Sequence, residues 1–267
     1  MTNYMKMYQS IEVEKSESLC TVWLNRPELH NAMNDIMIAE LTQVFRGFGG
    51  AGNLRLVILR GKGESFCAGA DLNYMKSIAT YGHEENLNDS IKLAKLFRAI
   101  YECPVPTITV VHGACLGGGN GLLAACDIAI SDINTVFAFS EVKIGIAPAT
   151  IAPFVIRRIG EYGARELMIT GKRFKGEEAM KWHLVNHAFA EKELEVELRK
   201  LIKQILSNGP NAVRATKDLI RHVVNEHHDI DETLDYTSRL ISELRASREG
   251  QEGMASFLKK KLFSDNI

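Results

Sequence analysis

The chain has 267 residues, of which 46% are hydrophobic and 24% are charged, and its formal net charge is −1. This length allows one large domain or two modest ones around a sizeable core. The balanced charge gives no support for a large nucleic-acid footprint or for an anionic membrane surface, so we expect no nucleic acid and no membrane among the partners.

The cysteines and the apolar runs indicate a cytoplasmic protein. The five cysteines are widely spaced without a Cys-x-x-Cys pair, a pattern typical neither of a disulfide framework nor of a zinc site. The opening residues, MTNYMKMYQS, lack the apolar stretch of a secretion signal, and no run is long enough to cross a bilayer. We therefore expect a cytoplasmic globular protein that holds no metal and no redox cofactor.

The first half of the chain alternates strand-like and helix-like segments. Apolar and β-branched runs predict strands at 19–24, 54–59, 107–111 and 128–130. Helical spacing of apolar residues predicts helices at 34–48 and 84–101, and from the glycine-rich run to about residue 126. Strands separated by helices indicate an α/β protein with right-handed crossovers.

The second half, from about residue 153 onward, is predicted to be almost entirely helical. Helical periodicity covers 153–169, 176–182, 191–207, 210–226, 230–246 and 250–260. No linker rich in proline, glycine or serine separates the two halves. We therefore predict an α/β core over residues 1–200 and a C-terminal helical region over residues 201–267, which packs on the core or reaches a neighbouring subunit.

Three adjacent glycines, Gly117 to Gly119, stand directly before a short apolar segment. Each glycine costs a helix roughly 1 kcal/mol relative to alanine, which indicates that bare backbone is needed here. A tight crossing of a strand and a helix is one explanation. A phosphate-binding P-loop is excluded because no Gly-Lys-Ser/Thr follows. A dinucleotide-binding loop is disfavoured because Cys115 replaces its central glycine, although Asp132 stands where a ribose-binding acid would lie.

The remaining explanation is a site for a negative charge. A glycine turn from a strand into a helix directs backbone N–H groups at whatever lies over the helix N-terminus, where the helix dipole favours an anion. If the charge develops only during a reaction, the turn supplies half of an oxyanion hole. A second turn of small residues, Ser65 to Asp71, could supply the other N–H donor.

Five motifs together resemble the enoyl-CoA hydratase/isomerase (crotonase) family. They are LNRPELHNAM, SFCAGADL, GACLGGGNGLLAACDIAI, FAFSEVKIGIAP and EGMASFLKK, in this order across nearly the whole chain. The resemblance implies a crotonase-type spiral of ββα turns with a C-terminal helical region that forms a homotrimer, or a homohexamer built from two trimers. It also implies an acyl-CoA thioester as the substrate, so that CoA is part of the substrate and no separate cofactor is needed.

The resemblance also implies which residues form the site. The oxyanion donors would be the backbone N–H groups of Ala70 and Gly118, holding the thioester oxygen as it becomes an enolate. Phe257 and Lys260 match positions that reach the CoA of a neighbouring subunit. The full set of expected substrate-binding residues is Ala68, Asp71, Leu72, Gly117, Gly121, Phe257 and Lys260.

The acid–base groups depart from the pattern of the family's hydratases. Those enzymes hold a water molecule between two glutamates, and this chain has the second one as Glu141 but has Gly121 in place of the first. Burial would raise the pKa of Glu141 toward neutrality, which suits a group that moves a proton next to a thioester. Asn120 is a candidate to orient the water, although an amide cannot act as a base.

A finer resemblance concerns the substrate. The runs GGGNGLLAACDIAI and SEVKIGIAPATIAPFVIRRIG are similar to a bacterial subgroup associated with methylglutaconyl-CoA hydration in leucine degradation. Such a substrate carries a second carboxylate, so we expect a cation at the acyl end of the site, with Lys143, Arg157 and Arg158 as candidates.

The leading hypothesis is an enoyl-CoA hydratase that acts on a short, branched or carboxylated 2-enoyl-CoA. The alternatives are an isomerase that converts 3-enoyl-CoA to 2-enoyl-CoA with Glu141 alone, an acyl-CoA decarboxylase that uses the same enolate, and a non-catalytic relative that binds acyl-CoA or RNA.

Overall fold

The structure, a computed structural model, describes residues 4–50, 52–225 and 229–264, with side chains described as far as residue 259. The chain divides into two compact units, Met1–Lys200 and Leu201–Ile267. The helix α7 (Glu191–Leu206) runs across the division. Among the described residues, no helix is both long and apolar enough to span a membrane.

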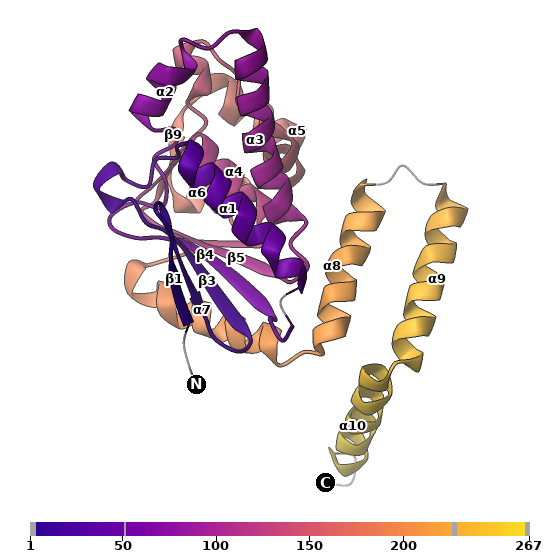
Figure 1. Ribbon diagram of the computed structural model, residues 1–267. Helices are drawn as coiled ribbons and strands as arrows, with labels where there is room; N and C mark the ends of the chain where they lie inside the picture. Colours follow the sequence, from indigo (N-terminus) through magenta and orange to yellow (C-terminus); the bar gives the residue numbers. More distant parts are fainter. Residues whose placement is uncertain (1–3, 51, 226–228, 265–267) are drawn as a thin grey trace. The chain divides into compact units, whose positions relative to one another are not determined.

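The larger sheet of the first unit runs in the order β1-β2-β3-β4-β5-β7-β10. The pairs β1–β2 and β2–β3 are antiparallel, and every later neighbour is parallel, so the central strands are covered by helices that connect them (Figure 1). The strands are β1 (Tyr4–Met7), β2 (Ile11–Lys15), β3 (Leu19–Leu24), β4 (Leu56–Gly61), β5 (Thr107–Val111), β7 (Ile128–Asp132) and β10 (His187–Phe189).

The chain also forms a smaller sheet, and strands of the larger sheet are followed along the chain by strands of the smaller one. Its strands are β6 (Ala114–Leu116), β8 (Val136–Ala138) and β9 (Arg173–Phe174). The change of sheet after β5 takes place at Gly113, whose φ of +62° and close approach to Glu64 require a residue without a side chain. β5 and β6 then lead into α4 (Gly118–Ala125), and β7 and β8 lead toward α5 (Ala152–Thr170). The spiral of ββα turns that the sequence resemblance implies is therefore confirmed.

Helices α1 (Asp35–Gly47) and α3 (His83–Tyr101) pack against each other and enclose the core. Helix α1 begins where the side chain of Asn34 accepts a hydrogen bond from the N–H of Met37, at 3.0 Å. Its apolar face is buried through Met37, Leu41 and Phe45. Burying a side chain of this size contributes roughly 1.5–3 kcal/mol to stability, so this face fixes α1 to the sheet.

The remaining elements of the first unit are short helical segments that lie around the two sheets. The 3-10 turn η3 (Glu141–Ile144) follows β8 and is the one that carries a predicted catalytic residue. The others are η1 (Pro27–Leu29), η2 (Phe48–Gly50), α2 (Leu72–Ile78) and α6 (Gly176–Lys181).

The second unit contains α8 (Pro210–Asn225), α9 (Ile230–Ala246) and α10 (Arg248–Ser264). Glu249 of α10 accepts hydrogen bonds from the N–H groups of Asn211 and Ala212 and so caps the first turn of α8. The rings of His222 and Tyr236 stack with centroids 3.7 Å apart and join α8 to α9. All three helices leave large apolar side chains exposed, such as Val224, Leu234 and Leu258.

The structure corrects the predicted secondary structure at several elements. The stretch after residue 153 is not entirely helical, since it contains β9 and β10, which are too short to show a strand period in the sequence. The run before the glycines contains a strand that is absent from the prediction, β6, whose three residues pair with β8. The strands β1, β2 and β8 and the helix α2 also have no counterpart among the predicted segments. The predicted segments lie close to the observed elements, although β4 begins at Leu56 instead of residue 54.

Candidate active site

Gly117 forms the turn between β6 and α4. Its φ of +48° and ψ of −120° lie in a region that only glycine enters readily, and its N–H donates to the carbonyl of Ala138 at 3.0 Å. The next residue, Gly118, is the first of α4, and within the described part of the chain its N–H has no hydrogen-bond partner. Such N–H groups at a helix start are available to an acceptor from outside.

The turn around Ala70 is held on both of its sides. Cys67 donates its N–H to the carbonyl of Ala114 and accepts from the N–H of Leu116, both at 3.0 Å. Met33 donates to the carbonyl of Gly69 at 2.7 Å and accepts from the N–H of Asp71 at 2.8 Å. The N–H of Ala70 itself faces away from Met33 and has no partner among the residues that the structure describes.

The two turns lie against each other. A Cβ atom built on Gly69 would be 3.3 Å from the carbonyl oxygen of Leu116, and one built on Gly117 would be 4.0 Å from the Cα atom of Gly69. The side chain of Met33 covers Gly118, because its Cε atom would be 2.3 Å from a Cβ there. Two backbone N–H groups without partners therefore come from adjoining segments, the arrangement that an oxyanion hole requires.

Glu141 places a carboxylate beside these turns. It begins η3, and its Oε1 atom lies 3.4 Å from the Cβ position of Gly117. Its other carboxylate oxygen, Oε2, is buried and has no hydrogen-bond partner among the described residues. Burial raises the pKa of Glu141, and its own backbone N–H opposes this only in part. A carboxyl group with a raised pKa and a free oxygen is suited to take up and return a proton.

Gly121 stands where the family's hydratases have their first glutamate, and the structure leaves no room for a side chain there. A Cβ atom there would lie 2.5 Å from Cγ2 of Ile151 and 2.7 Å from Cζ of Phe97. Both of these side chains are fully or almost fully buried in the core. The place where the family's hydratases carry their first glutamate is thus occupied by apolar side chains, and Gly121 offers no opening to a substrate at this position.

Asn120 is buried and bonded within the core. Its Nδ2 donates to the carbonyl of Ala138 at 2.9 Å, and its Oδ1 accepts from the thiol of Cys115 at 3.5 Å. These contacts tie α4 to β8 and β6. The side chain thereby supports the glycine turn from behind, which is a different role from the orientation of water that the sequence suggests.

The other predicted site residues differ from one another in their exposure to solvent. Ala70 and Leu72 are exposed, and Ala68 is half-buried with its N–H donated to the carbonyl of His30. Phe257 is an exposed residue of α10 in the second unit. Lys260 belongs to the same helix, but its side chain lies outside the described residues.

Asp71 faces inward instead of toward a ligand. Its carboxylate pairs with Arg26 at 2.8 Å and accepts the N–H groups of Asn73 and Tyr74 at the start of α2. Sequence reasoning did not identify Arg26 as part of the site. The available signal was the position of Arg26 in LNRPELHNAM, because this motif and SFCAGADL belong to the same family pattern.

Of the cations considered for the acyl end, Arg158 is already engaged. Its guanidinium donates to Oδ1 of Asn186 at 2.8 Å and to the carbonyl of Cys126 at 3.2 Å, so it supports the end of α4. Arg157 is exposed, with its guanidinium carbon 5.9 Å from the ring centroid of Tyr101. Lys143 is also exposed and shares η3 with Glu141.

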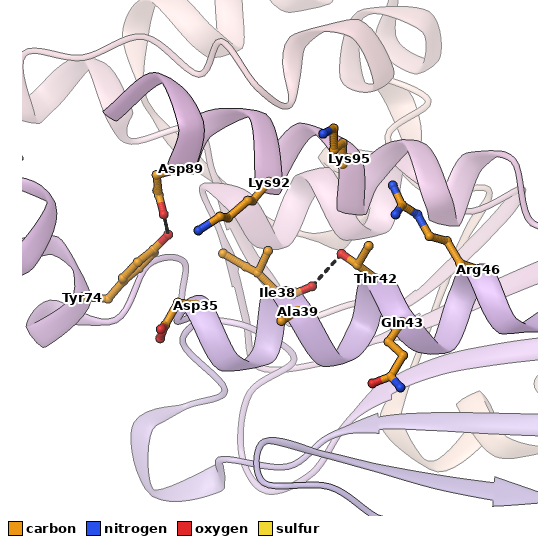
Figure 2. A pocket seen from close by; sticks show the side chains of 10 residues that line it. All are labelled: Asp35, Ile38, Ala39, Thr42, Gln43, Arg46, Tyr74, Asp89, Lys92 and Lys95. Carbon is orange, nitrogen blue, oxygen red and sulfur yellow. Dashed lines mark hydrogen bonds between the residues drawn. The ribbon is translucent and has the colours of Figure 1, made fainter. Parts of the chain in front are cut away.

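A cavity of about 520 Å³ is lined by residues of α1, α2 and α3 (Figure 2). The hydroxyl of Tyr74 donates to Asp89 at 2.5 Å across its end, and Lys92, Lys95 and Arg46 stand along its wall. It contains none of the predicted catalytic residues. Among the described residues, no group of His, Cys, Asp and Glu side chains is arranged to hold a metal ion.

Comparison with known proteins shows which family the chain resembles over its length. A sequence profile described as enoyl-CoA hydratase/isomerase matches residues 14–266. The short-chain-enoyl-CoA hydratase of Clostridium acetobutylicum is 32% identical, over 94% of this chain and 95% of its own. The mitochondrial Delta(3,5)-Delta(2,4)-dienoyl-CoA isomerase of Dictyostelium discoideum is also 32% identical, over 97% of this chain and 93% of its own.

The fold is equally similar to solved structures. The crystal structure of an enoyl-CoA hydratase from Shewanella pealeana superposes with a TM-score of 0.89 at 35% identity, covering 94% of each chain.

Proposed function

The chain belongs to the enoyl-CoA hydratase/isomerase family and is an enzyme of the hydratase/isomerase class, and we propose that it adds water to a 2-enoyl-CoA. The observation that carries this proposal is the position of Glu141. Its carboxylate lies against the turn at Gly117, and its Oε2 atom has no hydrogen-bond partner among the described residues. The relatives named hydratases match almost the whole chain, which supports hydration as the reaction.

The backbone N–H groups of Ala70 and Gly118 are proposed to bind the thioester oxygen. When water attacks C3 of the 2-enoyl thioester, electrons move through C2 onto this oxygen and form an enolate. Two fixed N–H donors stabilise that charge more than they stabilise the neutral carbonyl, and removal of one such donor typically costs 10²- to 10³-fold in rate. Because the donors are backbone groups, no side chain needs to be conserved at either position for this part of the reaction.

Glu141 is proposed to carry the proton. As the water oxygen bonds to C3, one water proton passes to the carboxylate, and the hydroxyl stays on C3. The protonated Glu141 then gives the same proton to C2, and the enolate collapses back to the thioester. Each atom of the water molecule ends in the product, and the carboxylate is regenerated. A single carboxylate therefore suffices for the addition, although the water must be oriented by another group.

The substrate itself is proposed to supply that orientation. Gly121 carries no carboxylate and Asn120 is bonded within the core, so a carboxylate on the acyl chain would take the place of the missing glutamate. The resemblance to proteins associated with methylglutaconyl-CoA supports such a branched and carboxylated substrate. Its distal carboxylate would pair with Lys143, which is exposed on the same turn as Glu141, because Arg158 already supports the end of α4.

The second candidate is an isomerase that moves a double bond from the 3-position to the 2-position. Glu141 would take a proton from C2 and return it to C4, with the same enolate held by Ala70 and Gly118. The presence of one carboxylate favours this reaction, and the isomerase of Dictyostelium discoideum shows that relatives named isomerases match the whole chain.

The protein is further proposed to be a homotrimer or homohexamer. The second unit exposes large apolar side chains on each of its helices, with Phe257 66% and Val224 60% exposed. An exposed apolar surface of this kind is typical of a subunit interface. In such an assembly Phe257 and Lys260 are expected to contact the CoA of a neighbouring subunit.

A panel of thioesters tests the proposed reaction. Purified protein is incubated with crotonyl-CoA, a 3-enoyl-CoA and 3-methylglutaconyl-CoA, and the products are analysed by mass spectrometry. Gain of one water by the 2-enoyl substrates, largest for the carboxylated one, is the expected result. The alternative result is that the 3-enoyl substrate is converted to its conjugated isomer while the 2-enoyl substrates gain no water. That result would contradict the hydratase proposal and support the isomerase.

A further inference from the structure

The guanidinium of Arg26 joins two backbone segments that meet at Ala70. Its Nη1 donates to the carbonyl of Ala32 at 2.6 Å, and its Nη2 donates to Oδ2 of Asp71 at 2.8 Å. The side chains of Arg26 and Asp71 are only 15% and 7% exposed. A buried guanidinium with two fixed acceptors holds its partners more rigidly than a surface ion pair does.

Asp71 connects Arg26 to the backbone turn around Ala70. Its Oδ1 accepts from the N–H groups of Asn73 and Tyr74, and its backbone N–H donates to Met33. Burial acts to raise the pKa of Asp71, but the hydrogen bonds from Arg26, Tyr74 and Asn73 outweigh it and lower the pKa. The carboxylate therefore stays ionised and keeps its partners at neutral pH.

Arg26 is itself anchored from the other side. Its N–H donates to Oδ1 of Asn31 at 2.8 Å, and the amide of Asn31 donates to the carbonyls of Lys62 and Ser65 at 2.8 and 2.7 Å. Asn31 is completely buried. The contacts thus form a continuous set that runs from the loop after β4, through Arg26, to Ala32 and to Asp71, the residue after Ala70.

We propose that Arg26, through its ion pair with Asp71, positions the N–H of Ala70 toward the thioester oxygen. The inference rests on the proposed function of that N–H. Arg26 contacts the backbone and Asp71 and not the reacting atoms, so it is a positioning residue. Displacing a catalytic group by about 1 Å can cost roughly 100-fold in rate, which makes the orientation of this donor decisive.

The test measures the carbonyl of a bound thioester. Butyryl-CoA labelled with ¹³C at C1 binds without reacting, and its C=O stretch in infrared difference spectra reports the hydrogen bonds to the oxygen. In the wild type, the stretch is expected to shift to lower frequency on binding. In Arg26→Gln and in Asp71→Asn the shift should shrink, and kcat for crotonyl-CoA should fall roughly 10- to 100-fold while KM changes less than about threefold.

Two further variants separate positioning from general stability. Arg60→Gln removes another partly buried ion pair, with Glu195, and should leave kcat and the infrared shift unchanged. The double variant Arg26→Gln/Asp71→Asn should lose no more activity than either single variant, because the two residues act as one unit. If Arg26→Gln does not fold, Arg26→Lys serves instead, since lysine keeps the charge but cannot reach Asp71 and Ala32 together.

The outcomes distinguish this inference from the function on which it rests. No shift in the wild type would contradict the oxyanion role of Ala70 and Gly118. A normal shift in the wild type that persists unchanged in the Arg26 and Asp71 variants, with wild-type kcat, would overturn the role of Arg26 alone. Losses in kcat that multiply in the double variant would also overturn it, because the pair would then not act as a unit.

Discussion

Oε1 of Glu141 lies 3.4 Å from the position that a Cβ atom would take on Gly117. This distance brings a buried carboxylate to the glycine turn that presents the N–H of Gly118. The turn needs glycine because its φ of +48° and ψ of −120° form a combination that only glycine adopts readily. The acid–base group and one of the proposed oxyanion donors are therefore placed by the same short stretch of backbone.

Substitution Gly117→Ala tests this relationship. Alanine disfavours the φ of +48° and ψ of −120° at this position, so the turn beside the Glu141 carboxylate must shift. We expect turnover of 2-enoyl-CoA to fall roughly 10- to 100-fold, measured by steady-state kinetics. Gly49→Ala is the matched control, because nothing lies within 4 Å of its Cβ position, and it should keep wild-type turnover. Equal kinetics for both variants would contradict the requirement for a glycine conformation at Gly117.

The raised pKa of Glu141 predicts how activity depends on pH. The proposed reaction starts with an ionised carboxylate that accepts a proton. The value of kcat/KM should therefore fall on the acid side as the pH drops through the raised pKa of Glu141, at a higher pH than for an ordinary carboxyl group. The measurement is a pH profile of kcat/KM for the wild type. A profile that stays flat down to the usual carboxyl pKa would contradict the burial of a functional base.

The same shift predicts the effect of Glu141→Gln on stability. The folded-state pKa lies above the unfolded-state value, so the folded protein binds the proton more tightly. The resulting contribution to stability is complete below the unfolded-state pKa and is lost as the pH rises through the folded-state pKa. Glu141→Gln should therefore have a higher Tm than the wild type at neutral pH, and the difference should shrink on acidification. A lower Tm at neutral pH would show that the ionised carboxylate has partners that stabilise the fold.

Gly121→Glu should not restore a second catalytic carboxylate. The new side chain would meet Phe97 and Ile151 at less than contact distance. Overpacking of this kind costs about 1–3 kcal/mol, so the variant should unfold at lower denaturant concentration and gain no hydratase activity. Gly47→Glu, at the exposed end of α1 where the Cβ position is open, should change stability by less than about 0.5 kcal/mol. Faster hydration by Gly121→Glu would mean that the position faces the substrate.

Asn120→Ala separates a structural role from the orientation of water. Its removal takes one of two donors from the carbonyl of Ala138, which keeps the N–H of Gly117. The variant should therefore lose about 0.5–1.5 kcal/mol of unfolding free energy in a denaturant titration. Hydration measured well below the Tm should stay within about tenfold of the wild type. A variant of unchanged stability that binds the thioester but has lost hydration would instead assign the water to Asn120.

Much of the fold follows from local sequence patterns. The alternation of β3, α1, β4, α3 and β5 is visible because each element repeats its own apolar period over several residues. The glycine run and the turn before Asp71 stand out because backbone with special geometry needs small residues. By contrast, β9 has only two residues and β10 three, so neither shows a period, and both are fixed by the strands beside them.

The parts of the site that the sequence could not predict depend on distant contacts. The pair Arg26–Asp71 joins residues 45 positions apart, and no local pattern indicates which of the acidic residues Arg26 meets. The closure of Gly121 depends on Phe97 and Ile151, which come from other elements. The sequence suggests that Asn120 orients water because it does not show that the Asn120 side chain bonds to Ala138 and Cys115.

Hydration in ¹⁸O-labelled water, by the wild type and by Glu141→Gln, is the decisive measurement for a hydratase with Glu141 as its single carboxylate. The wild type should add one labelled water to a 2-enoyl-CoA, seen by mass spectrometry. Glu141→Gln should do so roughly 100- to 10,000-fold more slowly while still binding the thioester. Label entering the product at equal rates in both proteins, or no label entering while a 3-enoyl-CoA becomes conjugated, would contradict a hydratase whose single carboxylate is Glu141.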